Sequence, residues 1–304
     1  MGKIKTTLLH IWTVLWKSVL FFVIWGILLA PFLIAFSNNL EGMGSVYGVP
    51  VRLYFELITM LTILCAAWIM VSFIDKRAFA TIGFMRNHLV RELLVGLGIG
   101  AGWLMLSIAV SLIFKSAVFD SSGSIIWPSL LVSGTAMLLN TVTQEVLARS
   151  YIFQTIQSET SAVWAIILTS ILFVLFHAAA LHGSWLPAIN IFFAGILFST
   201  AYYITKNLWM PISIHFIWNF LLGPVFGLAV SGQNLANNWK LFTLEGPSLL
   251  TGGSFGIEGS LIVTIITVLF IAGLLVWHNK FNSSEGEIGN DEAGTGDELI
   301  NQNI

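Results

Sequence analysis

Eight long runs of apolar residues divide the chain, and each is long enough to cross a lipid bilayer. A spanning helix needs about 20 mostly apolar residues. The runs lie at residues 18–36, 54–74, 93–114, 129–150, 162–182, 186–205, 208–230 and 260–277. This pattern predicts an all-α, polytopic integral membrane protein with about eight transmembrane helices, of which the fourth is the least apolar.

The same runs predict how the chain is organised. Residues 1–77 hold two N-terminal helices, and residues 78–230 form a central core. Residues 231–277 comprise an outer loop rich in Gly, Asn and Ser, which we expect to be irregular, and the last helix. Residues 278–304 hold six of the fifteen acidic residues. Because such a segment buries too little apolar surface to offset its ordering entropy, we expect a disordered, acidic cytoplasmic tail.

The composition excludes several classes of protein. Of the 304 residues, 57% are hydrophobic and only 9% are charged, and the mean hydropathy is +0.88. Soluble globular proteins carry about 25% charged residues, so a soluble enzyme is excluded. The net charge of −2 gives no electrostatic basis for binding nucleic acid. A single cysteine, Cys65, excludes a disulfide framework and a cysteine metal cluster.

Lysine and arginine are distributed unevenly between the predicted loops. If both termini are cytoplasmic, ten of these residues lie on the inner side: Lys3, Lys5, Lys17, Lys76, Arg77, Arg86, Arg91, Arg149, Lys206 and Lys280. Three lie on the outer side: Arg52, Lys115 and Lys240. This bias follows the positive-inside rule. We therefore expect a multi-pass protein of the cell membrane with both termini in the cytoplasm.

Polar residues interrupt the fourth predicted span. Thr141, Glu145 and Arg149 are spaced four residues apart, so they form one row on the helix surface. Asn140 and Gln144 form an adjacent row. The helix therefore directs its ionisable and amide side chains toward one side.

Two further spans carry polar residues at the same spacing. The fifth span has Phe173 and His177 four residues apart, and the seventh has His215 and Asn219 four residues apart. Each pair lies on one helix face. Three helices thus each direct a small set of polar side chains one way, as a shared interior site requires.

The spacing also places these groups at similar depths. Glu145 and His177 are each sixteen residues from Ser161, so both lie about 24 Å from the turn that joins their helices. His215 is nine residues beyond Lys206, or about 13 Å along its helix. The three groups can meet if the hairpin around Ser161 extends roughly 11 Å into the cytoplasm.

Ionisable groups inside a membrane need a reason to be there. At the centre of a spanning helix such a residue costs at least about 2.5–3.5 kcal/mol. A carboxylate, an arginine and two histidines retained for packing alone would be costly, so we expect a functional site. For Glu145 and Arg149 by themselves, an ion pair that holds the helix is an alternative to a chemical role.

These residues resemble the motifs of the CPBP family of intramembrane proteases, which includes the eukaryotic CAAX prenyl proteases and the bacterial Abi proteins. The family's Glu-Glu-x-x-x-Arg motif is matched by residues 144–149, its Phe-x-x-x-His motif by residues 173–177, and its His-x-x-x-Asn motif by residues 215–219. The resemblance covers about residues 78–225. All three motifs occur in order, on separate polar spans.

The resemblance implies an endopeptidase that cleaves a membrane-embedded or lipid-associated peptide. A glutamate and the first histidine, His177, would activate water against the peptide carbonyl. His215 and Asn219 would stabilise the resulting oxyanion, and Arg149 completes the first motif. One hydrogen-bond donor to an oxyanion in such a pocket is worth about 10²–10³ in rate.

One position departs from the family pattern. The family's general base corresponds to the first residue of the Glu-Glu pair, which is Gln144 here. An amide cannot accept the proton, and the loss of a general base costs about 10²–10⁴-fold in rate. Either Glu145 takes over the role after a rotation of about 100° about the helix axis, or the chain is a non-catalytic relative. Such a relative would act as a membrane scaffold or bacteriocin-immunity protein.

Two other kinds of chemistry fit the same residues. Glu145, His177 and His215 would be the ligand set of a zinc site with an open position for water, although we favour a glutamate mechanism with no cofactor. A proton-coupled transporter could use the same buried groups. No inverted repeat, which many such transporters contain, is visible in the sequence.

Glycine recurs at every second residue from Gly96 to Gly102. The run lies inside an apolar span rather than between a strand and a helix, so it is not a nucleotide-binding loop. Gly96 with Gly100, and Gly98 with Gly102, are small residues four apart. This spacing predicts close packing against neighbouring helices.

Overall fold

The computed structural model describes residues 2–37, 48–181, 183–234 and 239–279. Its longer helices are α1 (Gly2–Ser37), α2 (Gly48–Ile69), α3 (Leu89–Ile113), α4 (Trp127–Arg149) and α8 (Trp185–Thr205). Its shorter helices are α5 (Tyr151–Glu159), α6 (Ala162–Phe176), α7 (Ala178–Leu181), α9 (Trp209–Phe220) and α10 (Ser248–Thr251). The last described helix is Leu261–Asn279, and the strands are β1 (Ala117–Ser122) and β2 (Lys240–Leu244).

Five helices of the described residues are long and apolar enough to cross a membrane. They are Thr6–Ala35, Arg52–Ile74, Leu89–Ile113, Trp185–Thr205 and Leu261–Asn279. The helical membrane class is therefore confirmed, whereas the count of eight spans is not. The helix α4 has 23 residues but many polar ones, and α6 and α9 have only 15 and 12 residues.

Two predicted spans are broken near the polar residues that marked them. The predicted span 162–182 is divided at His177, which follows α6 with φ −100° and ψ 1°. The predicted span 208–230 ends its regular helix at Phe220 and continues as a π-helical turn, Leu221–Val225. Pro224 within this turn has no N–H to donate, so an ordinary α-helix does not continue.

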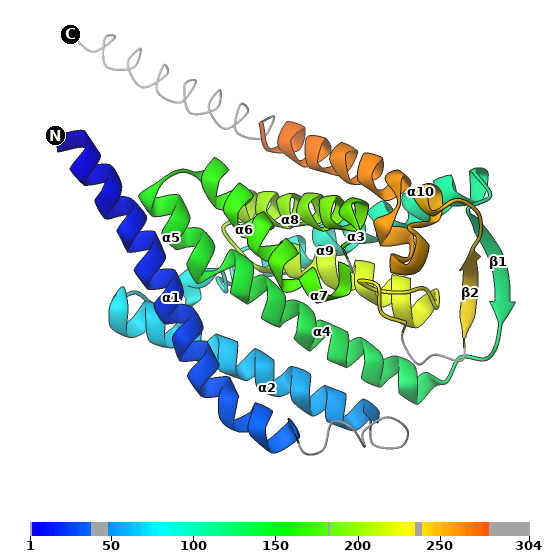
Figure 1. Ribbon diagram of the computed structural model, residues 1–304, viewed down its shortest axis with the longest axis horizontal. Helices are drawn as coiled ribbons and strands as arrows, with labels where there is room; N and C mark the ends of the chain where they lie inside the picture. Colours follow the sequence, from blue (N-terminus) through cyan, green and yellow to red (C-terminus); the bar gives the residue numbers. More distant parts are fainter. Residues whose placement is uncertain (1, 38–47, 182, 235–238, 280–304) are drawn as a thin grey trace, which may run out of the picture.

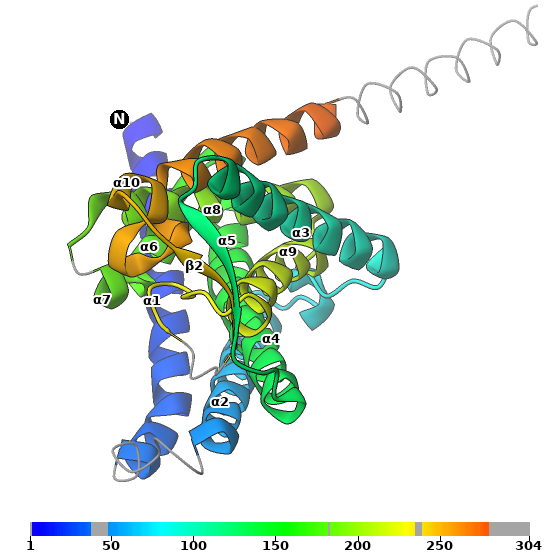
Figure 2. The ribbon, with the colours of Figure 1, turned by 90° about the vertical axis from the view of Figure 1, so that its right-hand side faces the viewer.

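The helices pack as neighbouring pairs around the middle of the molecule. Figure 1 shows α2 running beside α4, and α1 crossing in front of α2. The helix α3 packs against α9, and α6 packs against α8. Figure 2 shows α3 and α9 on one side of α4, with α1 and α6 on the other. Since α4, α6 and α9 carry the three motifs, this arrangement brings the motifs to the interior.

Glycines allow α3 to approach the backbone of α9. A Cβ atom at Gly96 would lie 2.7 Å from the carbonyl oxygen of Met210, and one at Gly100 would lie 2.5 Å from that of Ile214. Real Cβ atoms do not come so close, so only glycine fits at either position. The predicted close packing at this pair is confirmed, and it fixes the helix that carries His215.

The second glycine pair does not behave as predicted. A Cβ atom at Gly98 would have no neighbour within 4 Å, and one at Gly102 would make an ordinary contact of 3.8 Å with Phe270. The prediction of close packing is wrong for this pair. Its row of the helix faces away from α9, because positions two residues apart lie about 200° apart around a helix.

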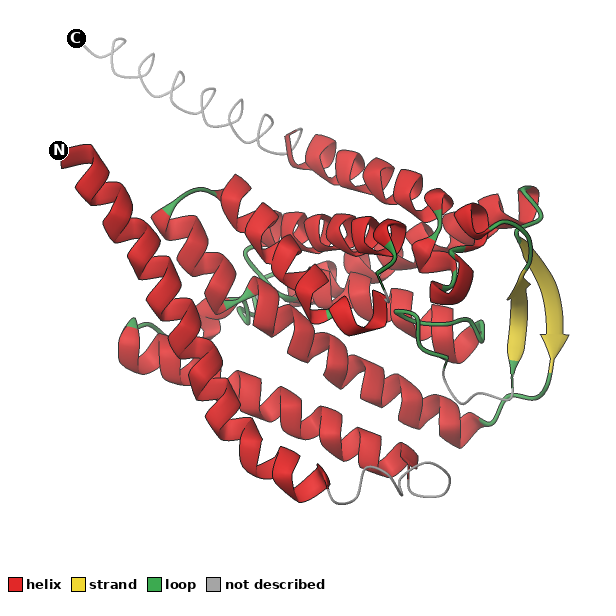
Figure 3. Cartoon of the chain, in the orientation of Figure 1, coloured by secondary structure: helices red, strands yellow, loops and turns green. Residues whose placement is uncertain are grey.

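The segments predicted as outer loops contain regular structure. Strands β1 and β2 pair in antiparallel fashion, with Phe119 opposite Phe242. The outer loop 231–258, expected to be irregular, therefore contributes β2, the short helix α10 and two 3₁₀ turns. Figure 3 shows this pair of strands at one end of an otherwise helical chain. The predicted outer loops that contain β1 and β2, after the third and the seventh predicted span, thus lie at the same end of the molecule.

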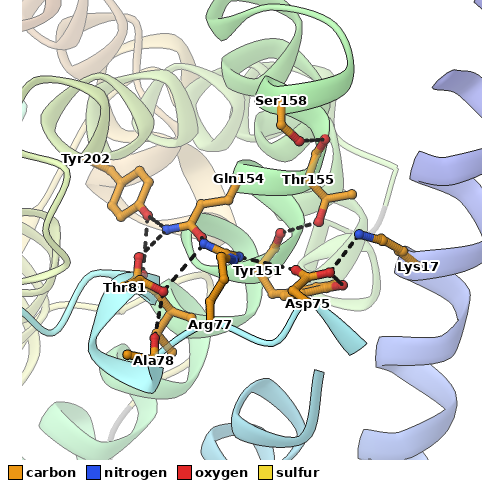
Figure 4. A network of polar contacts seen from close by, with 11 residues as sticks. Lys17, Asp75, Arg77, Ala78, Thr81, Tyr151, Gln154, Thr155, Ser158 and Tyr202 are labelled. Carbon is orange, nitrogen blue, oxygen red and sulfur yellow. Dashed lines mark hydrogen bonds and ion pairs between the residues drawn. The ribbon is translucent and has the colours of Figure 1, made fainter. Parts of the chain in front are cut away.

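A polar network ties together segments at the opposite end (Figure 4). Asp75 forms one ion pair with Lys17 of α1 at 2.7 Å and another with Arg77 at 3.3 Å. Gln154 of α5 accepts a hydrogen bond from Arg77 at 3.1 Å and donates one to the hydroxyl of Tyr202 at 2.6 Å. The network joins α1, the loop after α2, α5 and α8. It lies where the predicted inner loops meet.

The two described ends of the chain also lie at that end, away from β1 and β2 (Figure 1). This placement agrees with an even number of crossings, while the cytoplasmic assignment of the ends stays a prediction. Of the predicted acidic tail, residues 280–304 lie outside the described residues.

Candidate functional site

A carboxylate, a guanidinium and an imidazole form a cluster at the centre of the molecule. Arg149 donates from Nη1 to Glu145 Oε1 at 3.3 Å, and His215 Nδ1 lies 2.8 Å from the same oxygen. The side chains of Glu145 and Arg149 are fully buried, and that of His215 is 7% exposed. The cluster therefore links the ends of two motifs, one on α4 and one on α9.

Arg149 is enclosed by groups from α6 and α8. It donates to the carbonyl oxygen of Gly195 at 3.2 Å and to the hydroxyl of Ser199 at 3.3 Å. Its guanidinium carbon lies 4.4 Å from the ring centroid of Phe173 and 5.4 Å from that of Phe198. Stacking and hydrogen bonding of this kind suit the flat guanidinium of arginine rather than lysine. Arg149 thus holds together three helices and is fully buried among them.

His215 is also held by aromatic rings. Its ring stacks on Phe198 with a centroid distance of 4.7 Å and makes a T-shaped contact with Phe173 at a centroid distance of 5.8 Å. Because the ring is fixed on both sides and hydrogen-bonded to Glu145, its orientation is set by the tertiary structure.

His177 occupies the break between α6 and α7. Its Nδ1 atom lies 2.8 Å from the carbonyl oxygen of Phe173. A carbonyl oxygen only accepts hydrogen bonds, so Nδ1 carries the proton. In the neutral ring, Nε2 is then left as an acceptor.

A cavity of about 310 Å³ lies beside this cluster. Three of the predicted site residues line it: Gln144, His177 and Asn219. The remaining lining residues come from α2, α4, the α6–α7 region and the segment after α9: Arg52, Glu56, Met137, Asn140, Phe176, Ala179, Ala180, Val230, Ser231 and Gln233. Glu145, Arg149 and His215 are not among the lining residues. The six predicted residues are therefore divided between a buried cluster and a cavity wall.

The amide of Gln144 is held by its neighbour one turn earlier. Gln144 donates from Nε2 to Asn140 Oδ1 at 2.6 Å, as their shared helix face predicts. Its Oε1 atom is buried and has no hydrogen-bond partner among the described residues. A buried acceptor of this kind in a cavity wall is suited to bind a water molecule.

Glu56 of α2 lines the cavity but is not among the predicted site residues. Asn140 donates from Nδ2 to Glu56 Oε2 at 2.9 Å, so a line of hydrogen bonds runs from Gln144 to this carboxylate. The sequence does contain a feature that points to this residue, because Glu56 is an acidic residue within the second predicted span. The same rule that singled out Glu145, the high cost of a charge within a spanning helix, applies to it.

Glu258 fixes the loop that closes one side of the cavity. It accepts a hydrogen bond from Trp218 Nε1 at 2.8 Å and another from the backbone N–H of Ser231. Burial raises the pKa of the Glu258 carboxyl, and these two hydrogen bonds lower it by less. Since Ser231 lines the cavity, Glu258 helps to set its shape.

The predicted zinc ligands are not gathered around one point. Glu145 is buried with Arg149 and His215, whereas His177 lines the cavity, which neither Glu145 nor His215 lines. Within the described residues, no group of three or more His, Cys, Asp or Glu side chains is arranged to hold a metal ion. These residues, as arranged, do not fit a zinc site.

The central part of this chain is similar to a known protein family. Residues 126–221 match the family model described as type II CAAX prenyl endopeptidase Rce1-like. The match confirms the resemblance to CAAX proteases and covers all three motifs, whereas residues 78–125 and 222–225 of the predicted range lie outside it. No curated protein and no solved structure matches the chain.

Proposed function

We propose that this chain, whose residues 126–221 match the Rce1-like family of CAAX prenyl endopeptidases, is an intramembrane endopeptidase. Its substrate is a membrane-embedded or lipid-associated peptide, and water is the nucleophile. The observation that carries the proposal is the cavity of about 310 Å³ lined by Gln144, His177 and Asn219. An acceptor, an imidazole and an amide donor from three separate segments converge there.

His177 and Gln144 are placed to hold the attacking water. The protonated Nδ1 of His177 is bonded to the backbone, so Nε2 accepts a hydrogen bond from water. The unpartnered Oε1 of Gln144 accepts a second. Two acceptors orient the water so that a lone pair of its oxygen faces the peptide carbonyl. Such positioning lowers the barrier by restricting the reactants before reaction.

Asn219 supplies the donor for the developing negative charge. Its amide lines the same cavity one helical turn after His215. An amide N–H directed at the oxyanion stabilises the transition state more than the ground state. Since His215 does not line the cavity, Asn219 is the residue of this motif that acts directly on the substrate carbonyl.

Glu145 acts through His215 and is a positioning residue in this proposal. Its carboxylate is fully buried against Arg149 and His215. It therefore fixes the orientation of α9 and, with it, the position of Asn219. A rotation that brought Glu145 into the cavity would leave Arg149 unpaired in the interior, which costs about 3–5 kcal/mol.

A second function is favoured by one observation. Gln144 stands where the family carries a glutamate, so the cavity could bind a peptide without cleaving it. The protein would then be a membrane scaffold or bacteriocin-immunity protein.

The two functions are separated by reconstitution. The protein, H177A and N219A are placed in liposomes with a library of quenched fluorescent peptides, both lipidated and unlipidated. The matched control is H10A, because His10 lies on α1, far along the chain from the motifs, and pairs with Glu159. Cleavage by the natural protein and by H10A, but not by H177A, supports the protease. If peptides bind at the cavity but remain intact with every variant, the scaffold function replaces it.

A further inference from the structure

A carboxylate lies in the cavity at a place that none of the three motifs predicts. Glu56 projects from α2, is 7% exposed, and lines the cavity together with Gln144, His177 and Asn219. It therefore shares the space in which the proposed reaction takes place.

The contacts of Glu56 leave it available to cavity water. Its Oε2 atom accepts one hydrogen bond, from Asn140 at 2.9 Å. Its Oε1 atom lies 3.9 Å from Arg52 Nε, at the limit of an ion pair, and the Arg52 side chain is 47% exposed. A partly exposed pair at this distance contributes little, about 0–1 kcal/mol. Arg52 therefore neutralises the Glu56 carboxylate only weakly.

The position of Glu56 complements the departure at Gln144. Asn140 bridges the two side chains, accepting from Gln144 at 2.6 Å and donating to Glu56 at 2.9 Å. The carboxylate absent from the first motif is therefore present two hydrogen bonds away. It comes from a neighbouring helix, α2, which packs along α4.

Building on the proposed protease function, we propose that Glu56 is the general base of this cavity and replaces the carboxylate that the first motif lacks at Gln144. Glu145 does not fill this role, because its carboxylate is enclosed by Arg149 and His215 and does not line the cavity.

The proton transfers balance as follows. The oxygen of water forms a bond to the peptide carbonyl carbon while the proton that this water had directed at Gln144 Oε1 leaves that hydrogen bond and passes to the Glu56 carboxylate, directly or through one further water. The carbonyl oxygen becomes an oxyanion that Asn219 stabilises. The C–N bond then breaks, and the proton passes from Glu56 to the departing amine. Glu56 returns to its carboxylate form, and the products are a carboxylic acid and an amine.

The variant E56Q distinguishes a general base at position 56 from a side chain that only holds the hydrogen-bond network. A glutamine at position 56 still presents an oxygen that accepts from Asn140, so the line of hydrogen bonds to Gln144 is kept, but it cannot accept a proton. We expect kcat to fall by about 10²–10⁴-fold. KM and the melting temperature should stay close to those of the natural protein.

The matched control is E92Q. Glu92 is also a buried carboxylate, 6% exposed, that accepts a hydrogen bond from an asparagine, here Asn207 Nδ2 at 3.0 Å. It lies on α3 and does not line the cavity. E92Q should therefore retain the natural kcat.

A rescue experiment completes the test. The double variant E56Q/Q144E returns a carboxylate to the cavity at the motif position, and we expect at least a tenfold recovery of kcat over E56Q. A kcat of E56Q within threefold of the natural value overturns the proposal, and so does a double variant no more active than E56Q. If the natural protein cleaves no peptide, the proposed function itself fails. If the natural protein and E56Q cleave at the same rate, the role of Glu56 as general base is rejected, while the proposed protease function stands.

Discussion

His215 Nδ1 and Glu145 Oε1 lie 2.8 Å apart, although 70 residues separate them in the sequence. Their contact joins α4 to α9 in a region that is closed to solvent. The carboxylate also pairs with Arg149, so one buried oxygen connects the first and third motifs. Glu145 therefore links the helices that form the site, while Gln144 and Asn219, which are close to this cluster in sequence, line the cavity.

Removing one member of the buried ion pair should destabilise the protein. E145L leaves the Arg149 guanidinium without its counter-charge, and we expect the free energy of unfolding to fall by about 3–5 kcal/mol. The double variant E145L/R149M removes both charges and should be more stable than E145L. Equilibrium unfolding in mixed micelles measures the difference. If the loss of unfolding free energy in E145L/R149M equals the sum of the losses in E145L and in R149M, the two side chains do not interact. That result would contradict the pairing.

The close approach of α3 to α9 can be tested at two glycines. G100A places a Cβ atom 2.5 Å from the carbonyl oxygen of Ile214, so we expect a loss of about 1–3 kcal/mol in unfolding free energy. G98A is the control, because its added Cβ atom meets nothing within 4 Å. There the better helix propensity of alanine should give no loss, or a gain of up to about 1 kcal/mol. Equal losses at both positions would show that the two helices do not pack as described.

Substitution of Asn219 should affect the chemical step more than binding. N219A removes the amide that stabilises the oxyanion, and we expect kcat to fall by about 10²–10³-fold with little change in KM. Steady-state cleavage of a fluorescent peptide in liposomes separates the two constants. A rise in KM with unchanged kcat would assign Asn219 to substrate binding instead.

Stability should depend on pH through Glu258. Burial raises the pKa of this carboxyl in the folded protein above its unfolded value of about 4.3. The folded state therefore binds the proton more tightly, and this contribution to stability is present below that pH and is lost as the pH rises through the raised pKa. Melting temperatures from pH 4 to 8 should fall less steeply for E258Q than for the natural protein. Parallel curves would exclude this role for Glu258.

The proposed mechanism predicts that activity survives the removal of metal ions. Glu145 and His215 lie in the buried cluster and His177 lines the cavity, so the Glu145, His177 and His215 set is not arranged as ligands among the described residues. Treatment with a strong chelator, followed by metal analysis of the preparation, should leave the rate of cleavage unchanged. Loss of activity that returns with one equivalent of zinc would overturn the metal-free proposal.

Much of the site was predictable because helical spacing is local. Four-residue intervals placed Gln144 beside Asn140, and Glu145 beside Arg149, as the structure shows. The predicted turn near Ser161 is also present, with the Ser161 hydroxyl accepting from the backbone N–H of Trp164 at the start of α6. Each of these relationships is decided within one or two helical turns.

Relationships between helices were less predictable. The helical spacing left open a rotation that would turn Glu145 toward the substrate, whereas the structure directs Gln144 to the cavity and Glu145 to His215. Helical spacing does not connect Glu56 with Asn140, which lies 84 residues further along the chain. Periodicity tells which residues share a face, but not toward which neighbour that face is turned.

By itself, the sequence determined that the chain is a membrane protein, because it has too few charged residues to cover its surface in water. It also determined that polar groups on three helices face the interior. The tertiary structure decided which of those groups meet each other and which line the cavity. The physical reason is that lipid favours any arrangement that hides polar atoms. The choice among such arrangements is made by close packing, such as that of Gly96 and Gly100 against α9.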